Sequence, residues 1–160
     1  MKTTESFIVG QVFQHRNKNL IPQFFGNDFK NWLWISAQEK RVFINVFEKN
    51  NLKEYVLLKN MNNTTIQRIN NSIPMKEDQF WVILYLLIIN PKLGKKILKY
   101  KLLKDKFYVF HLKLNSRKVI ALGVGWNGDE WFLDAFDFHG LGLWMEDYDF
   151  VFLFHTIIEK

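Results

Sequence analysis

The most constraining feature of the sequence is the dipeptide Asn127-Gly128, which lies between two apolar segments. Both central residues of a type I′ turn need a positive φ, and Asn-Gly meets this need well. The dipeptide therefore predicts a tight β-hairpin over residues 119–136. Its register sets three pairs of residues opposite one another, namely Trp126 and Asp129, Val124 and Trp131, and Leu122 and Leu133. Leu122, Val124, Trp131 and Leu133 then share one face, which we expect to face the core.

Further short apolar runs with polar boundaries indicate more strands. They lie at residues 32–35, 42–47, 55–58, 98–102, 107–114 and 149–157. Short polar breaks separate the first three runs, and connections of this length join antiparallel neighbours. The last run is apolar on both faces, which places it in the interior of a sheet. We predict an α+β fold with a mainly antiparallel, meandering sheet of seven or eight strands.

One helix is expected to interrupt these strands. Pro74 and the acidic pair Glu77-Asp78 are typical of a helix start, because proline suits the first turn and carboxylates favour the positive end of the helix dipole. Residues 80–89 are apolar on every side, and Asn90-Pro91 should end the helix. We therefore expect a buried central helix that packs on one face of the sheet.

Two other segments have mixed patterns. Residues 60–72 are polar and rich in asparagine, and they are expected to form a loop with one or two helical turns. Residues 92–96 are expected to form a short helical turn before the strand at 98–102. In that strand Leu98, Tyr100 and Leu102 would share one side, with lysines on the other.

The composition is that of one compact domain over residues 1–160. There are 16 Phe and 6 Trp residues, so many large side chains are available for a core. Cysteine is absent, which excludes disulfides, thiolate metal ligands and cysteine nucleophiles. The start of the chain lacks the pattern of a secretory signal, and the apolar run at 80–89 is too short to cross a bilayer. We expect a cytoplasmic protein that does not bind membranes.

Charge is divided unevenly along the chain. Residues 1–118 hold 21 bases and 8 acids, a net charge of +13, whereas residues 119–160 hold one base and 8 acids, a net charge of −7. Seven lysines between residues 92 and 106 could contact phosphates, which makes a nucleic-acid-binding module one alternative. The candidate anion-binding residues are Lys95, Lys96, Lys99 and Lys101.

The acidic, aromatic segment near the C-terminus is the preferred candidate for specific contact with another protein. Its residues are Trp144, Glu146, Asp147, Tyr148 and Asp149. Aromatic anchors set the lifetime of a complex more than lysines do, and the carboxylates would complement a basic partner. The leading hypothesis is a non-enzymatic protein-binding domain of the inhibitor, immunity or adaptor kind. It requires Trp144 to be at least partly exposed.

A hydrolase or metal-dependent enzyme is the third class considered. Asp134, Asp137 and His139 are its candidate residues, since a carboxylate beside an imidazole can orient a base or hold a metal. The sequence contains no zinc-protease, phosphate-loop, nucleophile-elbow or EF-hand motif, so we expect no cofactor and no metal.

Overall fold

The computed structural model describes residues 5–13, 20–44, 50–128, 130–140 and 142–157. Its strands are β1 (Ser6–Ile8), β2 (Leu20–Phe25), β3 (Arg41–Phe43), β4 (Asn50–Val56), β5 (Met75–Lys76), β6 (Phe107–Lys113), β7 (Val119–Trp126), β8 (Trp131–Asp137) and β9 (Phe150–Ile157). Its helices are α1 (Val9–Val12), α2 (Asn27–Phe29), α3 (Ile35–Ala37), α4 (Asn63–Ile69), α5 (Glu77–Leu84) and α6 (Pro91–Leu98). Two π-helical segments, η1 (Lys30–Trp34) and η3 (Tyr85–Ile89), and a 3-10 turn, η4 (Glu146–Tyr148), complete the elements.

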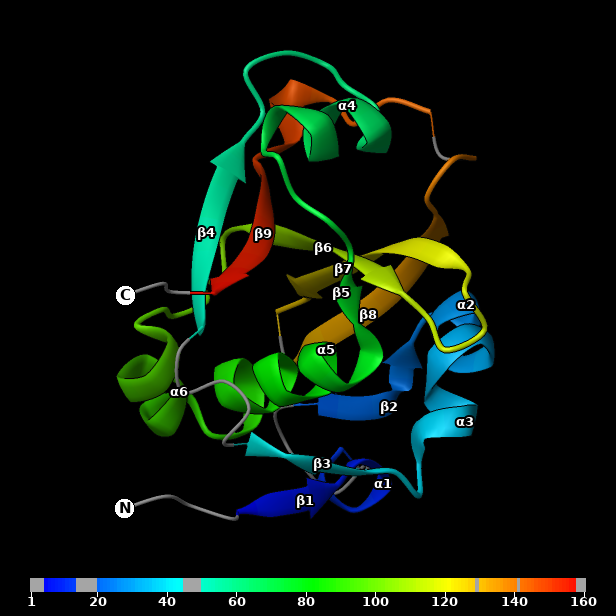
Figure 1. Cartoon of the computed structure of the whole chain (residues 1–160), viewed down its shortest axis with the longest axis vertical. Helices are drawn as coiled ribbons and strands as arrows, with labels where there is room; N and C mark the ends of the chain where they lie inside the picture. Colours follow the sequence, from blue (N-terminus) through cyan, green and yellow to red (C-terminus); the bar gives the residue numbers. More distant parts are fainter. Residues whose placement is uncertain (1–4, 14–19, 45–49, 129, 141, 158–160) are drawn as a thin grey trace.

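The fold combines helices and strands, as expected, but the main sheet is mixed and not an antiparallel meander. Its strands follow the order β2-β8-β7-β6-β9-β4, and β5 pairs with β6 beside this path (Figure 1). The pairs β2–β8, β6–β9 and β5–β6 are parallel, and the pairs β6–β7, β7–β8 and β4–β9 are antiparallel. A separate two-stranded antiparallel sheet joins β1 to β3. The expected meander in the first half of the chain is therefore wrong, because β3 and β4 pair with strands distant in the sequence.

The hairpin between β7 and β8 forms, with a register that differs from the prediction by two residues. Trp126 pairs with Trp131, and Val124 pairs with Leu133. The connection therefore spans four residues, and the side-chain oxygen of Asn127 accepts a hydrogen bond from the backbone N–H of Glu130 at 2.9 Å. A slip of two residues keeps each side chain on its face, so the expected core residues Leu122, Val124, Trp131 and Leu133 are all buried.

Residues 32–35 are helical, so the predicted strand there is wrong. They belong to η1 and α3, and Phe29, Leu33 and Ala37 are buried at a spacing of four residues. That spacing places the three side chains on one helical face, and packing of this face outweighs the short apolar run that suggested a strand.

The predicted strand at 98–102 is also absent. Helix α6 continues to Leu98 and ends at Lys99, whose φ of 56° is left-handed, and residues 100–103 form neither helix nor strand. Leu98 and Leu102 are both buried, which explains the alternating pattern without a strand.

The remaining boundaries lie closer to their predictions. The predicted strand at 42–47 is β3 at its start, and 45–49 lie outside the described residues. The predicted strand at 55–58 overlaps the end of β4, which begins earlier, at Asn50. Residues 60–72 contain α4, which the side chain of Asn62 caps by accepting a hydrogen bond from the Thr65 N–H at 2.8 Å.

Helix α5 and its π-helical continuation η3 are buried between the main sheet and the β1–β3 sheet (Figure 1). On one side, the centres of the Phe80 ring and the Phe110 ring of β6 lie 5.6 Å apart. On the other side, the Tyr85 ring stacks on the Phe7 ring of β1, with 4.5 Å between the ring centres. Trp81, which is fully buried, contacts the rings of Phe80 and three residues from earlier elements, namely Phe13, Phe29 and Trp34. In the described residues, no helix has the length and apolar character needed to cross a bilayer.

Residues 151–154 of β9 are buried on both faces of the strand, as the sequence predicted. Val151 and Leu153 belong to the core that includes α5, and Phe152 and Phe154 belong to a second core with Ile66 of α4. Strand β9 lies between β6 and β4, so it is an interior strand. The sheet therefore separates two apolar cores.

Gly128 supplies the first test of this fold. Its φ is +107°, and an added Cβ would meet no atom within 4 Å, so only backbone strain opposes a larger residue. We expect Gly128→Ala to lower the free energy of unfolding by about 1 to 2 kcal/mol, as measured by urea denaturation.

The matched control is Gly140→Ala, because the nearest atom to its added Cβ is Asp137 Cβ at 3.4 Å and its φ is not left-handed. This variant should unfold within about 0.5 kcal/mol of wild type. Equal stability of the two variants would contradict the described turn.

Candidate functional site

The predicted anchor Trp144 is buried and serves the second core. Only 5% of its surface is exposed, and its ring makes edge contacts with Phe136, Phe150 and Phe152. Its backbone exchanges two hydrogen bonds with Met61, at 2.7 and 3.2 Å. The condition that Trp144 be partly exposed is not met, so its role here is to hold the chain segment that follows.

A polar network beneath Trp144 fixes its orientation. The indole Nε1–H donates to Asn63 Oδ1 at 2.7 Å, and Asn63 Nδ2 donates to the carbonyl of Phe138 at 2.9 Å. His111 Nε2 lies 2.9 Å from the same Asn63 oxygen. Because that oxygen only accepts, Nε2 carries the single ring hydrogen and donates it to the bond. His111 is 1% exposed, and this burial lowers its pKa to about 4, which keeps the imidazole neutral near pH 7.

Exposed apolar side chains surround Trp144. Leu143 is 56% exposed, Met145 is 41% exposed and Tyr148 is 66% exposed. Together with Trp144 and three phenylalanines, Phe107, Phe136 and Phe150, they line a hollow of about 390 Å³. Adjacent exposed apolar side chains often mark an interaction site in soluble proteins, whereas apolar side chains exposed singly are common.

Three carboxylates are neighbours in the chain of the residues that line this hollow. Glu146, Asp147 and Asp149 are exposed, and they lie in and directly after η4. The Glu146 N–H donates to Asn60 Oδ1 at 2.9 Å, and Asp149 has a left-handed φ of 54°, so the turn has a defined shape. We call this surface the acidic apolar patch, which consists of Leu143, Met145, Glu146, Asp147, Tyr148 and Asp149.

The candidate enzyme residues are not brought together. Asp134 and Asp137 are three residues apart on β8 and therefore point to opposite faces of the sheet. Burial, with a smaller effect from nearby Asp28, raises the pKa of Asp134. Strand β8 ends at Asp137, which accepts a hydrogen bond from the His139 N–H at 3.2 Å within a turn. Across the described ranges, no three His, Asp, Glu or Cys residues are grouped to hold a metal.

The candidate anion-binding lysines lie at the end of α6 and just after it. Lys95, Lys96, Lys99 and Lys101 are all exposed to solvent. Lys104, farther along, places its ammonium 4.1 Å from the centre of the Trp126 ring, in a cation–π contact. Their use for binding stays a prediction.

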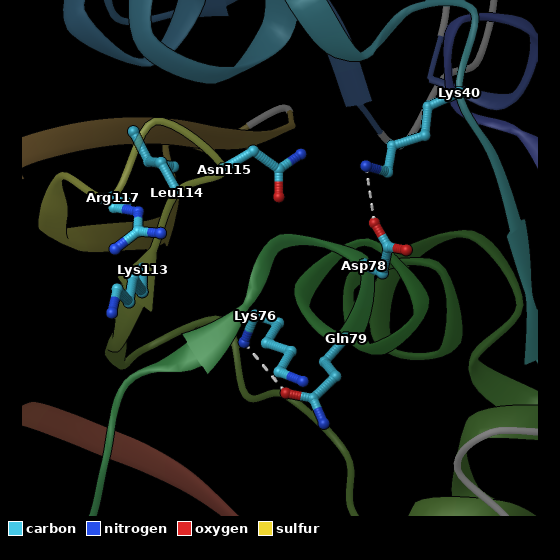
Figure 2. Close-up of a pocket in the computed structure, with 8 residues that line it drawn as sticks. All are labelled: Lys40, Lys76, Asp78, Gln79, Lys113, Leu114, Asn115 and Arg117. Atoms are coloured by element: carbon cyan, nitrogen blue, oxygen red, sulfur yellow. Dashed lines mark hydrogen bonds and ion pairs between the residues drawn. The ribbon is translucent and has the colours of Figure 1, made fainter.

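A pocket that the sequence did not suggest lies at the start of α5 (Figure 2). Its volume is about 500 Å³. The residues that line it are Lys40, Lys76, Asp78, Gln79, Lys113, Leu114, Asn115 and Arg117. We call it the basic pocket, because four of its described lining residues are cations, drawn from three stretches of the chain, and only one is a carboxylate. No local motif could have indicated it, because its lining comes from three distant stretches of the chain, at residue 40, residues 76–79 and residues 113–117.

Comparison with known proteins gives no functional assignment. No protein-family model, no curated protein and no solved structure matches this chain. Inferences about function therefore depend on the geometry described above.

The buried imidazole of His111 predicts a dependence of stability on pH. The unfolded chain takes up the proton near pH 6.5, whereas the folded state resists it until about pH 4. The free energy of unfolding is therefore unaffected by His111 well above pH 6.5, and it falls as the pH drops from about 6.5 toward 4. Between pH 7 and pH 5 the expected loss is about 2 kcal/mol, as measured by urea denaturation.

His111→Gln is the matched variant, because an amide can still donate to Asn63 but does not titrate. We expect its stability to fall less than that of wild type between pH 7 and pH 5. The other histidines and the carboxylates are common to both proteins, so an identical pH slope would show that His111 is not the titrating group.

Proposed function

We propose that this chain is a non-catalytic protein-binding module that uses the acidic apolar patch to bind a basic surface of another protein. The observation that carries the proposal is the exposure of Leu143, Met145 and Tyr148 around one apolar hollow. Burial of such side chains in a complex removes apolar area from water, and aromatic residues are enriched among those that dominate binding.

Charge supports the choice of partner. Residues 119–160 carry a net charge of −7, and three of their exposed carboxylates, at residues 146, 147 and 149, are next in the chain to Met145 and Tyr148 of the hollow. A basic partner surface would be drawn toward this end of the molecule, and an apolar side chain on it would fill the hollow. Lysine or arginine side chains around that apolar group would then face Glu146, Asp147 and Asp149.

Of the two anchors that the sequence suggested, Trp144 and Tyr148, only Tyr148 is exposed, and we assign the anchoring role to it. Its ring is 66% exposed and lies 6.0 Å from that of Phe150, which is itself packed on the second core. The base of the ring is thus supported while its outer face is free to be covered. Trp144 supports the patch from below and would not contact the partner directly.

The partner can be sought by a photo-crosslinking amino acid placed at Tyr148 and, as a control, at Ile73. Ile73 is 82% exposed and lies outside the patch. A basic protein crosslinked from position 148 and not from position 73 in the native host would support the proposal. The same products from both positions, or nucleic acid retained in their place, would contradict it and favour the lysine-rich alternative.

Affinity for the identified partner should depend on Tyr148. We expect Tyr148→Ala to weaken binding by about 2 kcal/mol, near thirtyfold, without unfolding the domain. Ile73→Ala should leave the affinity within a factor of two. Binding should also weaken as salt is raised, because the carboxylates lie at the rim.

A further inference from the structure

We propose that the basic pocket binds a small molecule that carries two linked phosphate groups. This proposal does not depend on the acidic apolar patch, which involves other residues. It starts from the unequal charge of the pocket lining, which holds four cations and one carboxylate.

The single carboxylate leaves most of that charge unpaired. Asp78 pairs with Lys40 at 2.8 Å, on one side of the pocket (Figure 2). Among the described residues, Lys76, Lys113 and Arg117 form no ion pair, which leaves a charge of +3 on the lining. Glu77 lies next in the chain, but it is buried, and its carboxylate accepts a hydrogen bond from the Asn115 N–H. Even with Glu77 included, the pocket remains positive.

The backbone holds these like charges close together. Lys76 and Lys113 are register partners on the parallel strands β5 and β6. Cations held side by side destabilise a fold unless an anion lies between them or near them. The first turn of α5 also borders the pocket, and its positive dipole end adds to the attraction for an anion.

Arg117 has a backbone conformation that residues with a side chain seldom adopt. Its φ is 76°, in the left-handed region. Two hydrogen bonds close the turn around it: the Arg117 N–H donates to the Leu114 carbonyl, and the Leu114 N–H donates to the Lys118 carbonyl, both at 2.8 Å. Glycine or asparagine adopts this conformation at lower cost. The turn instead carries a guanidinium, which is the side chain best suited to hold a phosphate through two parallel hydrogen bonds.

The charge and the volume together indicate the ligand. Two phosphate groups carry a total charge of about −3 to −4 near neutral pH, which matches the +3 of the lining. The volume of about 500 Å³ exceeds what one phosphate needs and lies within the range of small-molecule sites. The structure thus favours a diphosphate compound over a single inorganic phosphate.

Calorimetric titration of the full chain with inorganic pyrophosphate tests this site, with orthophosphate as the comparison. We expect wild type to bind pyrophosphate at least tenfold more tightly than orthophosphate. The variant Lys113→Gln with Arg117→Gln should bind pyrophosphate at least tenfold more weakly. The control, Lys95→Gln with Lys96→Gln, removes the same charge from exposed positions on α6 and should stay within a factor of two of wild type.

Other outcomes would overturn the proposal. They include a wild-type protein that does not bind pyrophosphate at millimolar concentration, and equal losses in the two double variants. In a third outcome, a single-stranded oligonucleotide without terminal phosphates displaces pyrophosphate from the protein. Both double variants would then weaken the binding of that oligonucleotide equally. That result would assign the charge to a nucleic-acid surface.

Arg117→Gly separates binding from stability. Glycine relieves the left-handed backbone, so the midpoint of thermal unfolding should stay equal to that of wild type or rise by about 2 °C. Pyrophosphate binding should nevertheless weaken at least fivefold. Unchanged binding in this stable variant would show that the guanidinium does not contact the ligand.

Discussion

Burial of both faces of one sheet is the constraint on which the rest of the structure depends. Strand β9 directs Val151 and Leu153 to one core and Phe152 and Phe154 to the other, and neither set can be left in water. Helix α5 covers one side, and α4 with the segment around Trp144 covers the other. The layers on both sides are therefore required by the alternation of side chains within a single strand.

The two candidate surfaces arise where these layers end. The acidic apolar patch lies at the border of the second core, where Trp144 is buried and Tyr148, four residues later, is exposed. The basic pocket lies at the start of α5, beside β5 and the turn after β6. One surface offers apolar area with negative charge, and the other offers a hollow with positive charge. The uneven charge of the sequence is thus expressed as two different kinds of surface.

Local features of the fold could be predicted from the sequence, and distant pairings could not. The hairpin strands β7 and β8 and the burial of β9 on both faces follow from periodicity and turn residues over a few positions. The parallel pairs β2–β8 and β6–β9 bring together segments with no local signal for one another. At residues 32–35 a short apolar run predicted a strand, but the buried side chains of Phe29, Leu33 and Ala37 recur every four residues, which is the spacing of one helical face.

The candidate sites show the same division. The acidic apolar segment was visible in the sequence, because its aromatic and acidic residues are adjacent, but its exposed ring could not be chosen. Trp144 and Tyr148 have similar neighbours in the chain, and only the hydrogen bond to Asn63 shows which one is internal. The basic pocket depends on three distant stretches of the chain and on the pairing of β5 with β6, so no sequence window contains it.

The place of β9 in the sheet also sets the order in which the molecule can fold. Strands β4 and β6 both pair with β9 in the sheet, and both precede it in the sequence, so both are synthesised before it. During synthesis, these strands stay without that partner until the last strand of the sheet leaves the ribosome. Pairings over such sequence separations form slowly, and the apolar strands remain open to wrong partners in the meantime. Prompt pairing by β9 would shorten the time in which the edges of β4 and β6 are open to wrong partners.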